Sequence, residues 1–374
     1  MIIVIPKERA ANERRVAVVP DVVPKLIALG AEVVVEPGAG EAAGFLDAAY
    51  ADKGARLDAG ALGRADVVLK VQPPSADEIA GMKEGAVLLG LLQPYSGGEA
   101  MTALAARKVT AFALELLPRI TRAQPMDALS AMSTVSGYKA VLLAASRLPR
   151  FFPLLMTAAG TLTPARVFVI GAGVAGLQAI GTARRLGAVV EAYDTRPAVK
   201  EQVESLGAKF VELGLETADA QDKGGYAKAQ SEEFYRKQRE MMGRSIAAAD
   251  VVIPTALVPG QKAPVLITEE MVRAMKPGSV IVDLAADQGG NCALTEPGTE
   301  VVKHGVLIVG PLNVPSTVPF HASQMYARNV TSLLTHLVKD GQVQVDLADE
   351  ITKGALVTHQ GEIVHDVVKK SLAR

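Results

Sequence analysis

The residues with the clearest chemical potential are three glycines, at positions 171, 173 and 176, in the sequence VFVIGAGVAG. An apolar run typical of a strand leads into G-x-G-x-x-G, and residues 174–186 then suit a helix. Such glycines let the backbone turn sharply and approach a pyrophosphate, whose charge the first N–H groups of the helix attract. We therefore expect a dinucleotide-binding turn here. The alternative is a turn that only packs a helix against a strand.

An acidic residue stands where such a turn would need one. Asp194 ends the next expected strand, 23 residues after Gly171. A carboxylate there can accept hydrogen bonds from both hydroxyls of the adenosine ribose and would repel a 2′-phosphate. Arg196 argues in the other direction, since an arginine could bind that phosphate. On balance the pattern favours NAD over NADP.

A second polar segment, RITRAQPMDALS at residues 119–130, lies between an expected strand and an expected helix. Its arginine, amide and carboxylate (Arg119, Gln124 and Asp127) could together hydrogen-bond a carboxamide and a ribose. The alternative is a helix N-cap at Asp127 or Ser130 with surface arginines, and spacing alone favours that alternative.

The histidines argue mildly against ordinary dehydrogenation. All five lie between residues 304 and 365, and the N-terminal stretch has none. A dehydrogenase that oxidises an alcohol or amine also moves a proton, usually through His or Lys near the nicotinamide. Each histidine is better explained as a packing or surface residue.

Two stretches of the chain alternate short apolar runs with helix-length segments, as parallel α/β proteins do. In the first, we expect helices at 21–29 and 99–107 and strands at 2–5, 32–36, 66–71, 86–92 and 110–114. In the second, we expect helices at 174–186 and up to Gly207, with strands at 166–171, 189–193, 209–212, 251–254, 279–283 and 306–309.

Two long apolar segments without internal breaks, 130–147 and 323–338, are expected to be helices that link the sheets. Short β-like runs follow at 343–347, 355–358 and 362–364. The predicted fold class is therefore α/β, with two Rossmann-like doubly wound domains with parallel sheets, linked by long helices. The first domain would be discontinuous (1–129 and 325–374) and the second would be 130–324.

A polar segment at 214–243 interrupts the second pattern where a tight connection is expected. Connections of that length in compact domains are usually functional or mobile. We expect a mobile loop there, and a surface helix over 230–242 is compatible with it.

Composition excludes several classes of protein. The 374 residues carry 39 Lys+Arg against 40 Asp+Glu, so nothing in the net charge of −1 favours binding to nucleic acid or an anionic membrane. The single cysteine, Cys292, allows no disulfide within the chain and no cysteine-based zinc site, and we expect no metal. The longest uncharged run, 167–183, has 17 residues and four glycines, so no membrane-inserted segment is expected.

Several motifs resemble the NAD(H)-binding soluble component of proton-translocating nicotinamide nucleotide transhydrogenases. They are RITRAQPMDALS, SGYKAV, GAGVAGLQA, the Gly-Gly-Tyr-Ala-Lys segment at 224–228, and MKPGSVIVDLA with GGNC. The N-terminal IPKE and NERRVAVVP are shared with alanine dehydrogenases. The resemblance covers essentially the whole chain.

The resemblance implies which residues bind the nucleotide. At the nicotinamide end it implies Arg119, Gln124 and Asp127 as catalytic, positioning residues, with Ser130 beside them. At the pyrophosphate turn it implies Gly171, Ala172, Gly173, Val174 and Gly176. At the ribose end and around the bound nucleotide it implies Asp194, Thr195, Arg196 and Leu257, and Gly225 and Tyr226 of the mobile loop.

Hydride transfer between two nicotinamides releases no proton, so it needs no general acid or base. It needs two C4 atoms held about 3–3.5 Å apart with water excluded. The resemblance implies that NADP(H) is bound by a partner subunit and that a membrane-spanning subunit conducts protons. It also implies a homodimer of this chain, located in the cytoplasm and attached through its partners to the cytoplasmic face of the inner membrane.

Two alternatives remain. An alanine-dehydrogenase-like amino-acid oxidoreductase is favoured by Arg15, which matches that enzyme's carboxylate-binding arginine, and by Asp287. It is opposed by Gln72 and Gln93, which replace its substrate lysine and its general-acid histidine. The other alternative is a non-catalytic NAD-binding module.

Overall fold

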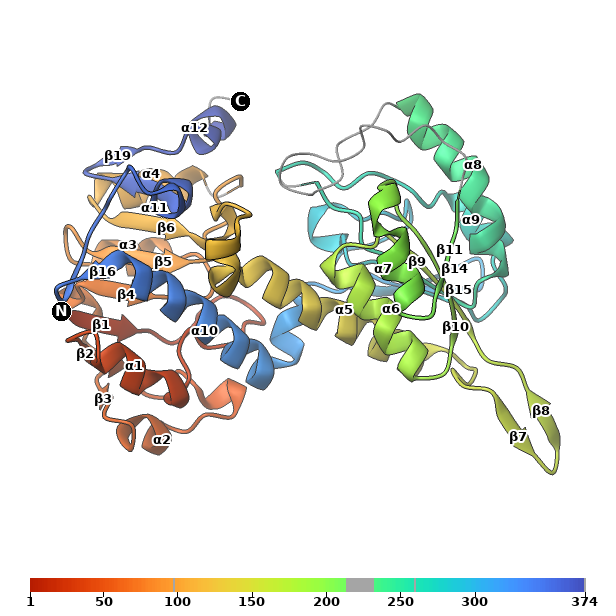
Figure 1. Cartoon of the computed structure of the whole chain (residues 1–374), viewed down its shortest axis with the longest axis horizontal. Coiled ribbons are helices and arrows are strands. Elements are labelled where there is room, and N and C mark those ends of the chain that lie inside the picture. The colour runs from red at the N-terminus through yellow and green to blue at the C-terminus, as the bar shows by residue number, and fades with distance from the viewer. Residues whose placement is uncertain (97, 213–231, 259, 373–374) are drawn as a thin grey trace. The chain divides into compact units, whose positions relative to one another are not determined.

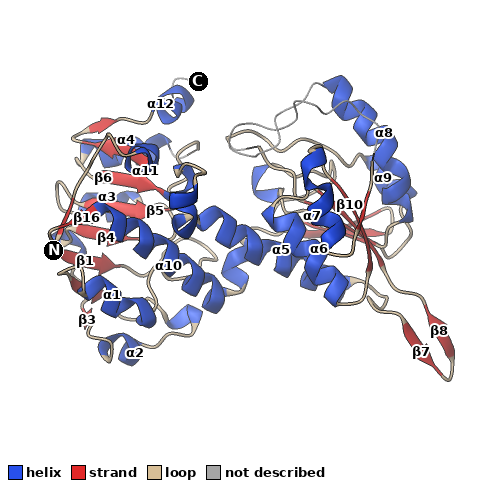
Figure 2. Cartoon of the chain, in the orientation of Figure 1, coloured by secondary structure: helices blue, strands red, loops and turns tan. Residues whose placement is uncertain are grey.

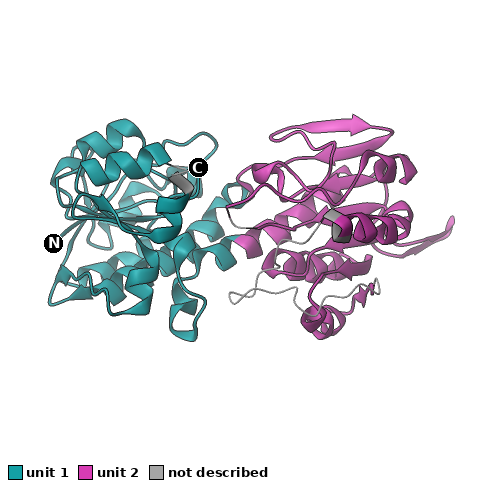
Figure 3. Cartoon of the chain, turned by 90° about the horizontal axis from the view of Figure 1, so that it is seen from above, with its two compact units in different colours: residues 1–132, 315–374 teal, residues 133–314 magenta. Residues whose placement is uncertain are grey.

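The computed structural model describes the chain except residues 97, 213–231, 259 and 373–374. It forms two compact units: residues 1–132 with 315–374 (unit 1), and residues 133–314 (unit 2), coloured separately in Figure 3. The sequence placed these boundaries after residues 129 and 324. Gly225 and Tyr226 of the expected mobile loop lie outside the described residues.

Unit 1 is built on an eight-stranded sheet in the order β19-β18-β6-β5-β4-β1-β2-β3 (Figure 1). Its strands are β1 (Ile2–Ile5), β2 (Glu32–Val35), β3 (Arg56–Leu57), β4 (Val67–Leu69), β5 (Val87–Gly90), β6 (Thr110–Ala113), β18 (Leu356–His359) and β19 (Glu362–Ile363). Strands β1 to β6 pair in parallel, whereas β18 and β19 are antiparallel. The chain order reverses between β1 and β4, which makes that position the topological switch point of the sheet.

Helices surround this sheet, as Figure 2 shows. They are α1 (Val23–Ile27), α2 (Asp47–Ala51), α3 (Ala76–Gly81), α4 (Gly98–Ala106), α10 (Pro319–Leu337), α11 (Glu350–Ala355) and α12 (Asp366–Leu372). Short 3₁₀ helices are η1 (Pro20–Val22), η2 (Glu41–Ala43), η3 (Leu62–Arg64), η4 (Leu114–Leu116) and η5 (Thr121–Met126), and β16 (Val338–Lys339) pairs with β17 (Gln342–Val343). Val4, Val68, Leu88 and Ala111 from the central strands form one side of the core.

Unit 2 contains a seven-stranded sheet in the order β11-β10-β9-β12-β13-β15-β14. Its strands are β9 (Arg166–Ile170), β10 (Val189–Tyr193), β11 (Lys209–Phe210), β12 (Val251–Pro254), β13 (Val280–Val282), β14 (Glu300–Lys303) and β15 (Val306–Val309). Only β14 is antiparallel among these described strands.

The remaining elements of unit 2 are the helices and one hairpin. They are α5 (Ala128–Arg147), which begins in unit 1, α6 (Val174–Arg185), α7 (Lys200–Ser205), α8 (Glu232–Ala248), α9 (Glu269–Ala274), the 3₁₀ helices η6 (Pro197–Val199), η7 (Ala286–Gln288) and η8 (Val314–Thr317), and the hairpin β7 (Leu155–Thr157) with β8 (Gly160–Leu162).

The α/β class and the two doubly wound sheets are confirmed, with corrections at the sheet edges. The expectation of purely parallel sheets is wrong for β14, β18 and β19, which connect through short turns that only antiparallel pairs permit. The expected helix at 21–29 is shortened to α1 with η1 before it, because Pro24 lacks the N–H that a longer α-helix needs. The expected strand at 343–347 is confined to β17, since residues 344–346 pair with no strand.

By length and composition alone, α5 is the helix among the described residues that could cross a membrane, and 39% of its most apolar stretch is buried in the fold. Its residues Ala140, Val141 and Ala144 are fully buried in the core of unit 2. A core helix therefore accounts for its apolar face.

Candidate functional site

The turn between β9 and α6 has a separate requirement for each of its three glycines. Gly171 has φ +96°, a conformation that side chains disfavour. At Gly176 a Cβ would lie 1.8 Å from the Gly171 carbonyl oxygen, so only glycine lets α6 come this close to β9. At Gly173 a Cβ would meet only Arg196 Nη2, 4.0 Å away. The first and third glycines shape the turn, and the second leaves the open space that a pyrophosphate needs.

Two residues that sequence reasoning missed support this turn. At Gly137 on α5 a Cβ would lie 2.1 Å from the carbonyl oxygen of Ala175, in the first turn of α6. The Thr255 hydroxyl lies 3.1 Å from the carbonyl oxygen of Gly171 and 3.2 Å from that of Ile170. The signal for Gly137 was a lone glycine inside an apolar helix, which costs about 1 kcal/mol unless packing requires it.

The expected ribose end is a closed ion pair. Asp194 accepts hydrogen bonds from the Ala172 N–H at 2.7 Å and from the Arg196 guanidinium at 2.8 and 2.9 Å. Both side chains are largely buried, and Thr195 lies between them in sequence. Asp194 therefore links the end of β10 to the glycine turn, and ribose hydroxyls would compete with Arg196 for its oxygens.

Leu257 and Val174 complete the group of expected site residues in unit 2. Leu257 follows β12 and is 38% exposed, and Val174 opens α6 and is 37% exposed. Strands β10, β9 and β12 are neighbours in the sheet, so their carboxyl ends bring Asp194, the glycine turn and Leu257 to one edge. Ligands of doubly wound sheets bind at that edge.

The loop at 119–130 belongs to unit 1. Within η5, Ala123 and Met126 are buried while Gln124 is exposed, and Arg119 is exposed just before it. The Asp127 carboxylate accepts hydrogen bonds from the Ser130 N–H at 2.9 Å and hydroxyl at 2.6 Å. The structure thus shows Asp127 as the N-cap of α5, the interpretation that spacing favoured, and leaves Gln124 facing solvent.

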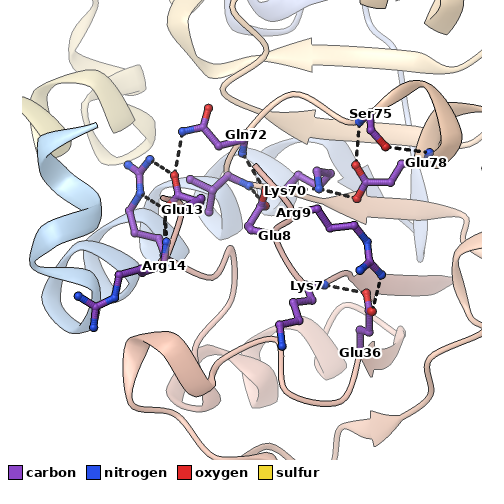
Figure 4. A network of polar contacts seen from close by, with 12 residues as sticks. Lys7, Glu8, Arg9, Glu13, Arg14, Glu36, Lys70, Gln72, Ser75 and Glu78 are labelled. Carbon is purple, nitrogen blue, oxygen red and sulfur yellow. Dashed lines mark hydrogen bonds and ion pairs between the residues drawn. The ribbon is translucent and has the colours of Figure 1, made fainter. Parts of the chain in front are cut away.

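A buried polar network lies at the carboxyl ends of β1 and β4 in unit 1 (Figure 4). The Arg15 guanidinium donates to Glu13 at 2.6 and 2.8 Å, and the Gln72 amide donates to Glu13 at 2.8 Å. Gln93 in turn donates to Gln72 at 3.3 Å. Burial alone would raise the pKa of Glu13, but Arg15 and Gln72 lower it to about 2. Arg15 is therefore bound to an internal carboxylate.

A further group of this network surrounds Lys70. This side chain is fully buried between Glu78, at 2.8 Å, and Glu8, at 3.3 Å. Burial raises the pKa of Glu8 although Lys70 opposes the shift. Next to the network, burial raises the pKa of Glu115 to about 7, against the hydrogen bond that its Oε1 accepts from the Gln93 N–H at 2.7 Å. The other oxygen of Glu115 is buried without a partner.

No group of three or more metal-ligating His, Cys, Asp or Glu side chains occurs in the described part of the chain. Three histidines have partners in their own unit: His304 with Glu269, His336 with Asp349, and His359 with Thr110.

Fold and turn together define a class: doubly wound α/β proteins with a glycine-rich turn suited to a dinucleotide. The alanine dehydrogenase/PNT N-terminal domain family matches residues 4–136, and the alanine dehydrogenase/PNT C-terminal domain family matches residues 140–366. The chain therefore belongs to the alanine dehydrogenase/PNT family.

Two named relatives and one solved structure separate the branches of this family. The first of the separate chains of NAD(P) transhydrogenase subunit alpha from Rhodospirillum rubrum is 54% identical over 376 residues, 98% of each chain. Alanine dehydrogenase of Bacillus subtilis is 32% identical over 386 residues, 100% of this chain and 95% of the other. The crystal structure of a transhydrogenase from Sinorhizobium meliloti matches with a TM-score of 0.88 and 47% identity, covering 97% of this chain and 100% of the other. The chain thus resembles transhydrogenases more closely than alanine dehydrogenases.

Glu115→Gln is expected to stabilise the protein in a pH-dependent way. Because the pKa of Glu115 is raised from 4.5 to about 7 on folding, the native state holds its proton more tightly, and stability falls as the pH rises through that window. At pH 8 the variant should be more stable than the wild type by up to about 3 kcal/mol in urea unfolding, and at pH 5 the difference should vanish.

The matched control is Glu84→Gln. This exposed carboxylate is paired with Lys108, which lowers its pKa, so its replacement should raise stability at neither pH. An equal gain for Glu115→Gln at pH 5 and pH 8 would contradict the account of Glu115.

Proposed function

We propose that this chain is the NAD(H)-binding component of a proton-translocating nicotinamide nucleotide transhydrogenase. It passes a hydride directly between NADH and NADP⁺ held by a partner subunit. The observation that carries the proposal is the turn between β9 and α6, where Gly173 leaves open space in front of the α6 N-terminus. The 54% identity to a transhydrogenase subunit supports the choice of reaction.

In this proposal NAD(H) binds to unit 2, which serves as the NAD-binding domain (130–324 in the sequence-based division). The pyrophosphate lies at Gly171, Ala172, Gly173, Val174 and Gly176. The ribose hydroxyls replace Arg196 on Asp194 beside Thr195, and Arg196 then becomes available to a phosphate. Leu257 contacts the nucleotide, and Gly225 and Tyr226 close over it.

The nicotinamide end is assigned to unit 1. The exposed Gln124 amide orients the ring of NADH, Arg119 contacts the nucleotide, and Asp127 with Ser130 orients the carboxamide or ribose. Since hydride transfer between nicotinamides needs no proton at the reacting carbons, a loop without histidine suffices. NADH supplies the hydride, and these residues fix its direction.

We propose NAD(H) for this chain and NADP(H) for the partner. The buried carboxylate of Asp194 at the end of β10 supports this choice, because it matches ribose hydroxyls and disfavours a 2′-phosphate. A membrane-spanning subunit supplies proton conduction, so this chain acts in the cytoplasm at the cytoplasmic face of the inner membrane. Neither nucleic acid binding nor direct membrane insertion belongs to this role.

An alanine-dehydrogenase-like activity is less well supported. Arg15 is bound to Glu13, and neutral amides (Gln72 and Gln93) stand where that enzyme has a lysine and a histidine. With Arg15 paired internally, a keto or amino acid would have to displace a buried carboxylate. A non-catalytic NAD-binding module would leave the exposed Gln124 without a role.

We further propose a homodimer. The hairpin β7–β8 projects from unit 2 (Figure 1), its segment 151–164 carries no charge, and Met156 is 79% exposed. Phe151, Leu154 and Leu162 are exposed beside it. An isolated two-stranded hairpin is marginal in water, so a second copy of the chain that covers it would account for its apolar surface.

Gln124→Asn should impair hydride transfer more than binding. The shortened side chain displaces the amide by about one methylene, and a 1 Å displacement can cost about 100-fold in rate. With the NADP(H)-binding partner added, transhydrogenation should fall by about that factor while the Kd for NADH stays nearly constant.

Gln72→Asn makes the same chemical change in the buried network of unit 1, and should leave the transfer rate close to that of the wild type. Equal rates for Gln124→Asn and the wild type would refute the positioning role of Gln124.

Met156→Lys with Leu162→Lys should convert the dimer to a monomer in sedimentation measurements, because charges on the hairpin would be buried at the interface. Val302→Lys, at an exposed apolar position on β14, is the control and should remain a dimer. A dimer that survives both hairpin lysines would show that another surface forms the interface.

A further inference from the structure

We propose that Asn291 is a positioning residue for the nucleotide site: its carboxamide holds the loop at 256–264 beside the glycine turn. The inference rests on the proposed function, which places the nucleotide at the carboxyl ends of β9, β10 and β12. Asn291 itself lies in the loop after β13 and contacts no reacting atom in this account.

The carboxamide of Asn291 closes the loop at both ends. Its Oδ1 accepts a hydrogen bond from the Ala256 N–H at 3.0 Å, and its Nδ2 donates to the carbonyls of Ala256 and Pro264, both at 2.9 Å. The side chain is fully buried. The orientation of the amide is unambiguous, because a flipped amide would place its oxygen against two carbonyls.

Asn291 is itself held in place. Its own carbonyl accepts from the N–H groups of Leu266 and Ile267 at 2.8 and 3.0 Å. The preceding loop is organised by the fully buried Asp283, which accepts from the Cys292 N–H at 2.9 Å and the Thr295 hydroxyl at 2.6 Å. The clamp therefore has a rigid base.

The loop that Asn291 closes lies next to the turn. Its first contact with the turn is Thr255, whose hydroxyl lies 3.1 Å from the Gly171 carbonyl oxygen, and Leu257 follows two residues later. Loss of the clamp would free Ala256 and, with it, the position of Leu257. Three buried hydrogen bonds on one side chain are costly to maintain for a loop without a function.

Asn291→Asp tests the clamp with a side chain of the same shape. The carboxylate keeps the acceptor for the Ala256 N–H but presents lone pairs to both carbonyls. At pH 8 the Kd for NADH should rise at least about tenfold. As the pH falls the new carboxyl takes up a proton and regains one donor, so the affinity for NAD⁺, which tolerates acid, should recover relative to the wild type.

Asp250→Asn is the matched control. Asp250 is a buried carboxylate at the opposite end of β12, where it accepts from the Arg166 N–H at 2.9 Å and from Lys276 at 3.0 Å. Its replacement should lower stability and leave the Kd for NADH unchanged. Equal losses of affinity in both variants, or no recovery of Asn291→Asp at low pH, would overturn the positioning role.

Hydrogen exchange on the wild-type protein keeps the inference testable if Asn291→Asp does not fold. The amide of Ala256 should be protected from exchange without nucleotide, since Asn291 accepts its hydrogen bond. Exchange at the rate of an open peptide would overturn the clamp. Failure of the wild type to bind NADH would instead overturn the proposed function, and normal binding by Asn291→Asp would overturn only the inference.

Discussion

The close approach of α6 to β9 is the constraint on which the site in unit 2 depends. Gly176 sits against the Gly171 carbonyl, where a single methyl group would lie at 1.8 Å. That contact directs the first turn of α6, and its unpaired N–H groups, toward the edge of the sheet. Gly137, Thr255 and Asp194 then fix the turn from three neighbouring elements.

The two units use the same edge of a parallel sheet in different ways. In unit 2 the carboxyl edge offers backbone N–H groups and an open space at Gly173, which suits an anionic ligand. In unit 1 the corresponding edge is filled by side chains that satisfy one another, such as Glu13 with Arg15 and Lys70 with Glu78. Unit 1 therefore contributes to the proposed reaction through the exposed Gln124 rather than through a pocket at its own switch point.

The sequence predicted the central strands, the long helices and the glycine turn, because these follow from local periodicity and from backbone geometry that only glycine permits. It did not predict β14 or the hairpin β7–β8, whose strands are exposed and carry no apolar alternation. It also missed Gly137, Thr255 and Asn291, because their roles depend on contacts between segments far apart in the chain. The pairing of Arg196 with Asp194 was equally hidden, since spacing shows that two charges are near each other but not that they are bonded.

The central claim is that this chain holds NAD(H) for a hydride exchange with a second nucleotide. Calorimetric titration of the purified chain with NADH and with NADPH, alongside an assay of NAD⁺ reduction by L-alanine, tests it most directly. The account predicts selective binding of NADH and no turnover of alanine. Turnover of alanine would show that Gln72 and Gln93 do not prevent amino-acid oxidation, and preferential binding of NADPH would show that Arg196, rather than Asp194, decides the specificity.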